Sequence, residues 1–129
     1  MAFIPMSGGG KKIEISSISS NHNLDSSTKG YGNVYLTIDC KEYSKLSIES
    51  FTKSSGSGYY REESTIKGTN SLGTTTLFSY AQPSGTTSHS ESNLEYDISS
   101  YDSIQFYIRT CANGTTTCGT ITFSNVVIE

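Results

Sequence analysis

The stretch that decides the fold reads Asp97-Ile98-Ser99-Ser100-Tyr101-Asp102-Ser103-Ile104-Gln105-Phe106-Tyr107-Ile108 and lies near the end of the chain. Ile104, Phe106 and Ile108 fall on one side of an extended backbone, and the polar side chains between them fall on the other. A period of two is typical of a half-buried strand. Residues 121–128 begin with the same alternation, so two strands are predicted here.

A turn signal separates these two runs. Asn113-Gly114 is a dipeptide that favours a β-hairpin. With these two residues as the turn, Phe106 faces Ile121 and Ile104 faces Phe123, which puts the apolar residues of both strands on one face. A wider loop keeps the same parity, so alternation does not select the register.

The cysteines bear on that choice. In the wider loop Cys111 lies opposite Cys118, and a disulfide between them would close a short loop. In the tight turn the two sit diagonally and stay reduced. Both states are compatible with the sequence. Cys40 has no partner in this scheme and is interpreted as a small core or edge residue.

The rest of the chain alternates in further short runs. Expected strands cover residues 12–16 (an edge strand), 33–39, 46–50, 59–66 (mostly exposed), 72–80 and 94–98. In the third of these, Leu46, Ile48 and Ser50 share a side. Residues 82–92 read as a polar loop. No segment has apolar residues at helical spacing over three turns. The prediction is an all-β protein, an antiparallel two-sheet β-sandwich of jelly-roll type.

Length and composition agree with that class. The 129 residues predict one domain over 13–129, preceded by a flexible tail over 1–12 that contains Gly8-Gly9-Gly10. Serine and threonine make up 40 residues, and hydrophobic residues only 33%, so the core must be thin. This composition suits pleated surfaces better than helices.

An internal echo supports a two-sheet design. Ile38-Asp39-x3-Tyr43-x2-Leu46-x-Ile48 matches Tyr96-Asp97-x3-Tyr101-x2-Ile104-x-Phe106, 58 positions later. In each copy the aspartate can accept backbone N–H groups in a turn, and the tyrosine can cover the core edge where the chain changes sheets. Duplication and two independent loops of similar chemistry both explain the match.

Several partner classes are disfavoured. Nine basic residues are scattered among twelve acidic ones, so no nucleic-acid surface is expected. No apolar run approaches the roughly 20 residues of a membrane helix, so no membrane insertion is expected. The start of the chain has neither a basic segment nor a long apolar one, so no signal peptide is predicted.

Catalytic and metal constellations are also weak. The two histidines, His22 and His89, lie in polar segments. Ser88, His89 and Glu91 supply the residue types of a triad, but local crowding does not supply its geometry. No nucleophile elbow, Cys-x2-Cys or Asp-x-Asp-x-Asp motif occurs. We therefore expect no catalytic residue, no metal, no cofactor and no enzymatic activity.

Tyrosine is the abundant aromatic residue, with nine against five phenylalanines. Tyrosine suits adhesive surfaces because it buries area and keeps a polar tip, although it also serves as ordinary sheet covering. The candidate binding residues are Tyr59, Tyr60, Tyr80, His89 and Tyr107.

The opening stretch, followed by residues 119–128, resembles the closing strands of galactose-binding-like jelly rolls. That group includes carbohydrate-binding modules and modules of phage tails and adhesion devices. The resemblance implies a non-enzymatic structural or adhesion module, associated with a phage tail or virion. It would work in a virion or outside the cell, assembling with copies of itself or with virion proteins.

The alternative that the resemblance offers is a carbohydrate-binding module that uses tyrosines and polar loop residues to bind a cell-surface glycan. Carbohydrate-binding modules of this kind often use a tryptophan platform, and this chain has no tryptophan.

Overall fold

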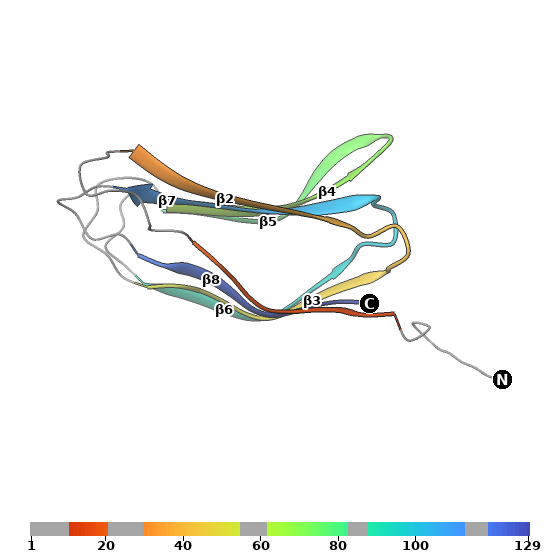
Figure 1. Cartoon of the computed structure of the whole chain (residues 1–129), viewed down its shortest axis with the longest axis horizontal. Helices are drawn as coiled ribbons and strands as arrows, with labels where there is room; N and C mark the ends of the chain where they lie inside the picture. The colour runs from red at the N-terminus through yellow and green to blue at the C-terminus, as the bar shows by residue number, and fades with distance from the viewer. Residues whose placement is uncertain (1–10, 21–29, 55–61, 83–87, 113–118) are drawn as a thin grey trace.

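The chain forms two antiparallel four-stranded sheets packed face to face, which confirms the predicted β-sandwich (Figure 1). The computed structural model describes residues 11–20, 30–54, 62–82, 88–112 and 119–129. The strands are β1 (Ile13–Ser19), β2 (Gly30–Asp39), β3 (Lys45–Lys53), β4 (Glu62–Asn70), β5 (Gly73–Gln82), β6 (His89–Asp97), β7 (Ser103–Ala112) and β8 (Ile121–Ile128). Most of the predicted tail lies outside the described residues, and β1 begins at Ile13.

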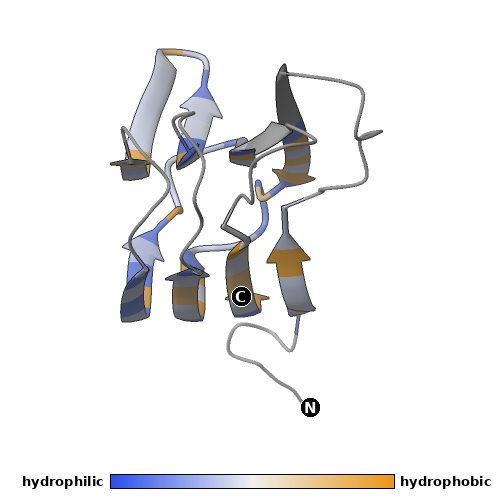
Figure 2. Cartoon of the chain, turned by 90° about the vertical axis from the view of Figure 1, so that its left-hand side faces the viewer, coloured by the Kyte–Doolittle hydropathy of each residue, from blue (hydrophilic) through white to orange (hydrophobic). Residues whose placement is uncertain are grey.

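Each sheet mixes strands from both halves of the chain. Sheet A has the order β1-β8-β3-β6, and sheet B has the order β2-β7-β4-β5. Figure 2 views the molecule along the strands, with the two sheets as two rows. The predicted edge position of the first strand is confirmed, since β1 borders sheet A.

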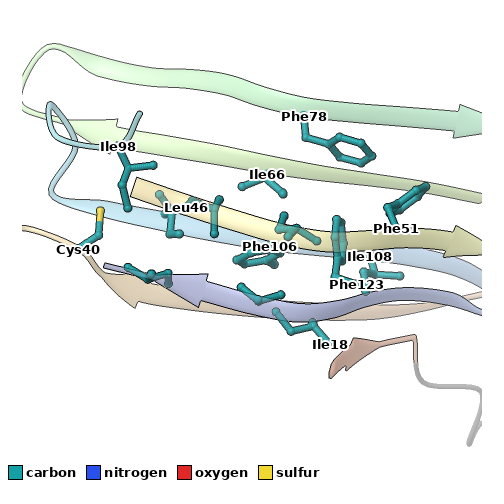
Figure 3. Close-up of a cluster of buried hydrophobic side chains, with 14 of the residues drawn as sticks. Ile18, Cys40, Leu46, Phe51, Ile66, Phe78, Ile98, Phe106, Ile108 and Phe123 are labelled. Carbon is teal, nitrogen blue, oxygen red and sulfur yellow. The ribbon is translucent and has the colours of Figure 1, made fainter. Parts of the chain in front are cut away.

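The core lies between the sheets and is built from the inward rows of both. Figure 3 shows Phe51 and Phe123 of sheet A with Phe106 and Phe78 of sheet B. Ring centroids of Phe123 lie 5.0 Å from Phe51 and 5.2 Å from Phe106. The aromatic cluster therefore joins the two layers at the middle of the sandwich.

The predicted hairpin between the last two strands is wrong. β7 pairs with β2 and β4 in sheet B, whereas β8 pairs with β1 and β3 in sheet A. Phe106 and Phe123 still meet, but across the core. Alternation determines which face of a strand is apolar. In a sandwich, the side chains of the opposite sheet cover that face, so alternation does not show which strands pair.

Two further predictions need correction. The strand near residues 59–66 was expected to be mostly exposed, but Glu62, Ser64 and Ile66 are fully buried because β4 lies inside sheet B. The polar loop predicted over 82–92 is partly strand, because β6 begins at His89 and pairs there with Lys53.

Sheet A is interrupted along one line that crosses all four strands. In β3 the buried positions shift from Leu46 and Ile48 to Phe51 and Lys53, so the inward parity predicted for Ser50 is wrong. Three more residues lie beside Glu49 on this line, namely Ser16 of β1, Asn125 of β8 and Asn93 of β6.

Both asparagines on this line adopt left-handed backbone angles. The φ values are 55° at Asn93 and 52° at Asn125, a region that asparagine tolerates better than most residues. Asn125 Nδ2 donates a hydrogen bond to Glu49 Oε1, which ties β8 to β3 at this point. We call this row the parity line, because the inward face of sheet A changes to the other set of residues there.

The internal echo corresponds to two turns that link the sheets. One carries the chain from β2 to β3, and the other carries it from β6 to β7. Asp39 Oδ1 accepts the Lys41 N–H at 3.0 Å, and Asp97 Oδ1 accepts the Ser99 N–H at 2.9 Å. The turn-forming role predicted for both aspartates is confirmed.

Backbone hydrogen bonds also join the two turns to each other. The Cys40 N–H donates to the Asp102 carbonyl, and the Ile98 N–H donates to the Ser44 carbonyl, each at 2.9 Å. A shift of 58 positions exchanges these two bonds, so the turns are related by an approximate two-fold axis. Cys40 is fully buried at this contact, as expected for a core residue.

The predicted role of tyrosine in the turns is clearest at Tyr101. Its ring lies against Gly68 of β4, where a Cβ atom would be 2.6 Å from Tyr101 Cγ. A side chain at position 68 would displace the ring, so glycine is required there. This contact closes one end of the core.

The opposite end of the sandwich, at the left of Figure 1, gathers the strand ends that flank residues 21–29, 55–61, 83–87 and 113–118. Three buried polar or charged side chains lie there, from Lys53, Glu62 and Thr110. We call it the Lys53 end, and it holds the candidate site.

Candidate functional site at the Lys53 end

A fully buried ion pair spans the two sheets. Lys53 is the last residue of β3 in sheet A, and Glu62 is the first residue of β4 in sheet B. Lys53 Nζ lies 3.7 Å from Glu62 Oε1, and both side chains are 0% exposed. Because a buried charge is costly unless it is paired, each of these residues stabilises the charge of the other.

Gly119 also contacts the buried pair. Its N–H donates to Glu62 Oε1 at 3.4 Å. A Cβ atom at position 119 would lie 2.1 Å from the Ser54 carbonyl oxygen, so only glycine fits. Neither Glu62 Oε2 nor Thr110 Oγ1 has a hydrogen-bond partner among the described residues.

Burial raises the pKa of the Glu62 carboxyl above its ordinary value, because a low-dielectric site disfavours the charged form. The Lys53 ammonium and the Gly119 N–H favour the carboxylate and lower the pKa, but by less. The folded protein therefore holds the Glu62 proton more tightly than the unfolded chain does.

This raised pKa predicts a pH dependence of stability. The contribution of Glu62 is fully present below the ordinary carboxyl pKa of 4.5 and is lost as pH rises through the raised value. In Glu62→Gln this part of the dependence disappears, because an amide does not titrate. Unfolding midpoints of both proteins, measured from about pH 4 to about pH 8, test it. A wild-type midpoint that rises relative to the variant across this range would contradict the assignment.

An aromatic stack lies beside the ion pair and bridges the edges of the sheets. Tyr80 of β5 and His89 of β6 have ring centroids 4.9 Å apart and planes at 24°. Phe51 lies beneath both, at 5.4 Å from Tyr80 and 6.1 Å from His89. Burial, and secondarily the Glu62 carboxylate, raise the pKa of the Tyr80 phenol.

His89 is held from a second direction. Its Nε2 lies 3.0 Å from Glu91 Oε2, two residues along the same strand. The stack with Tyr80 and this contact together fix the plane of the imidazole ring. A side chain positioned in this way can present a ring and a polar atom to a ligand without first losing rotamer freedom.

His89 is also one of the residues that line a shallow hollow of about 430 Å³. Eight of the described residues line it, and six of these carry hydroxyl groups. They are Thr52, Lys53, Ser54, Ser88, His89, Ser90, Thr120 and Thr122. We call this the hydroxyl hollow. Its surface offers many weak hydrogen-bond donors and acceptors.

Of the candidate binding residues, the structure brings together Tyr80 and His89. Tyr107 lies elsewhere, on the outer face of sheet B, where its ring is 4.9 Å from that of Tyr35. Its hydroxyl donates to Asn33 Oδ1 at 3.2 Å.

Other candidates lie outside the described part of the chain. This applies to Tyr59 and Tyr60 and, for the proposed disulfide, to the side chain of Cys111 and to the whole of Cys118.

Sequence reasoning missed the buried pair. Simple alternation from Leu46 directs Lys53 toward solvent, and the switch at the parity line reverses that assignment. One signal was present, because Phe51 has the opposite parity to Leu46 and Ile48 and is too large to be left exposed in a small core.

Among the described residues, no group of three or more histidine, cysteine, aspartate and glutamate side chains is arranged to hold a metal ion. Within the same residues, no helix is long and apolar enough to cross a membrane.

Comparisons with known proteins give a likeness of fold. No protein-family description matches the chain, and no curated protein matches it in sequence. Among solved structures, it resembles the K3 cleaved adhesin domain of Lys-gingipain from Porphyromonas gingivalis W83. The identity is 11%, the TM-score is 0.45, and 88% of this chain and 71% of that one are covered.

Two other solved structures are similar in the same sense. The enzymatically active domain of tailspike protein 4 from bacteriophage CBA120 has 13% identity and a TM-score of 0.46, covering 92% of this chain and 19% of that one. The CBM32 of AlyQ, in complex with 4,5-unsaturated mannuronic acid, has 16% identity and a TM-score of 0.32, covering 89% and 94%. At these identities and TM-scores the likeness concerns the β-sandwich fold alone.

Proposed function

We propose that this protein is a non-enzymatic adhesion module that binds a glycan in the hydroxyl hollow. The observation that carries the proposal is His89, which lines a surface rich in hydroxyl groups and whose ring is held by Tyr80 and Glu91. Sugars offer hydroxyls for hydrogen bonding and C–H faces for contact with rings. A shallow site with a few oriented polar groups suits that chemistry.

The buried pair supports this role by making the floor of the site rigid. Lys53 and Glu62 connect the sheets directly beneath the strand ends that form the hollow. Thr120 N–H donates to Ser54 Oγ at 2.8 Å, which joins two lining residues from different strands. A preformed site loses little conformational entropy when it binds.

The test is a glycan array followed by calorimetric titration of the best ligand. His89→Ala is expected to weaken binding at least about tenfold, which corresponds to about 1.4 kcal/mol. Tyr80→Ala is expected to act in the same direction by releasing the imidazole ring. Thr74→Ala serves as the matched control, since Thr74 is exposed at the far end of the β4–β5 hairpin.

Two outcomes would count against glycan binding. One is an array that stays blank at high protein concentration. The other is a titration in which His89→Ala and Thr74→Ala bind as tightly as the unaltered protein.

A finer proposal places the module in a phage tail or another virion component, outside the host cell and among copies of itself. The β2 edge of sheet B supports it, because residues 30–38 carry no charge that would oppose pairing with another copy. None of the described residues that line the hydroxyl hollow belongs to β2. Association in solution can be measured whether or not a glycan is found.

A further inference from the structure

The sandwich has four edge strands, β1 and β6 in sheet A and β2 and β5 in sheet B. An edge strand presents a row of unpaired backbone N–H and C=O groups that can pair with another chain. Natural proteins usually protect such edges with charges, irregular backbone, short length or a bend. The four edges of this protein differ in how far they are protected.

Both edges of sheet A are protected. β6 carries Glu91 and Glu95 and is interrupted by the left-handed conformation of Asn93. β1 has seven residues, carries Glu14, and is crossed by the parity line at Ser16. A second strand could follow neither edge without meeting like charges or a break in the ladder.

The β5 edge of sheet B is protected in another way. The pairing of β4 and β5 shifts register between Ile66 and Lys67. Beyond that point the hairpin bends out of the plane of the sheet, as Figure 1 shows at the upper right. The outer edge of β5 is therefore not a straight ladder.

The β2 edge has no internal charge, register shift or bend, and its one charged residue is the last, Asp39. Its ten residues pair with β7 without a register shift, and no residue from 30 to 38 is charged. Val34, Leu36 and Ile38 form its inward row and are only half-buried, whereas their β7 partners are fully buried. On the outward side Tyr35 is 63% exposed. A straight edge with no charge before its last residue, and with a half-buried apolar row, is suited to pairing with another strand.

We propose that two copies of this chain associate antiparallel through their β2 strands, forming one continuous eight-stranded sheet. A two-fold axis brings each strand against an identical strand, so no like charges oppose one another over residues 30–38. The two half-buried rows then lie side by side and cover each other. Ten residues extend about 33 Å, which is long enough for a continuous ladder.

The test is the mass of the protein in solution over a wide concentration range, measured by sedimentation equilibrium. The unaltered chain is expected to shift from monomer to dimer. Tyr35→Lys, which places a charge on each copy near the axis, is expected to weaken association at least about tenfold. Ser79→Lys is the matched control, because Ser79 is exposed on β5, the other edge of the same sheet.

Hydrogen exchange gives a second readout that needs no variant. Amides of β2 are expected to become more protected as concentration rises, while those of β5 do not change. The proposal is overturned if the unaltered chain stays monomeric with β2 amides unprotected throughout, which would leave that edge to a strand from a different molecule. It is also overturned if Ser79→Lys disrupts the dimer as strongly as Tyr35→Lys.

Discussion

Replacing Glu62 with leucine is expected to lower the free energy of unfolding at neutral pH by about 3–5 kcal/mol. The substitution removes the carboxylate that lies 3.7 Å from Lys53 Nζ, and with it a negative charge that stabilises the buried ammonium. Urea unfolding followed by circular dichroism measures the change. The slope with denaturant should stay constant if the native fold is retained.

A matched control separates burial from charge pairing as such. Lys45 of β3 and Glu95 of β6 form a second ion pair, with Lys45 Nζ 3.6 Å from Glu95 Oε1, but their side chains are 47% and 64% exposed. Glu95→Leu is expected to change stability by less than about 1 kcal/mol. The double variant Lys53→Met, Glu62→Leu is expected to recover most of the loss, because an apolar pair of similar volume needs no counter-charge. A double variant as unstable as Glu62→Leu would show that the charges themselves are required.

Phe123→Ala is expected to lower the free energy of unfolding by about 3–5 kcal/mol, the range found when a large aromatic side chain is removed from a core. The Phe123 ring lies within 5.7 Å of three other phenylalanine rings, from both sheets. Its removal leaves a cavity where the layers meet. The same urea experiment measures the loss.

The control for this prediction is Leu72→Ala at the tip of the β4–β5 hairpin, where the side chain is 94% exposed. We expect no measurable change there. Double-mutant cycles add a sharper requirement, since Phe123 should couple to Phe51, its partner in sheet A, and to Phe106 across the core. Additive effects in both cycles would contradict the packing described here.

The strands and the apolar face of most of them could be predicted from the sequence. Ile104, Phe106 and Ile108 are buried as their alternation requires, and the two aspartate turns form as their spacing indicates. These features depend on neighbouring residues alone. Local chemistry is therefore sufficient to define them.

The partner of each strand could not be predicted in the same way. A turn signal at Asn113-Gly114 favoured pairing of β7 with β8, but the two strands belong to different sheets. Both arrangements place Phe106 and Phe123 on the core side of their strands. The choice between them depends on which of several apolar strands lies alongside, and that information is spread over the whole chain.

The candidate site shows the same division. Tyr80 and His89 were predicted singly as candidate binding residues, and their stacking needed β5 and β6 to border the same side of the sandwich. The buried pair escaped detection because Lys53 lies beyond the parity line. Strict alternation fails there because the interruption runs across all four strands of sheet A.

That interruption has an evolutionary consequence. Sheet A consists of two half-sheets in opposite phase, joined where Glu49 lies beside Asn93 and Asn125. A substitution that made one strand regular would turn its inward side chains beyond the parity line toward solvent, while those of the neighbouring strands still faced the core. Single changes toward a regular pleat would therefore be selected against, and the boundary can be gained or lost only when four segments of the chain change together.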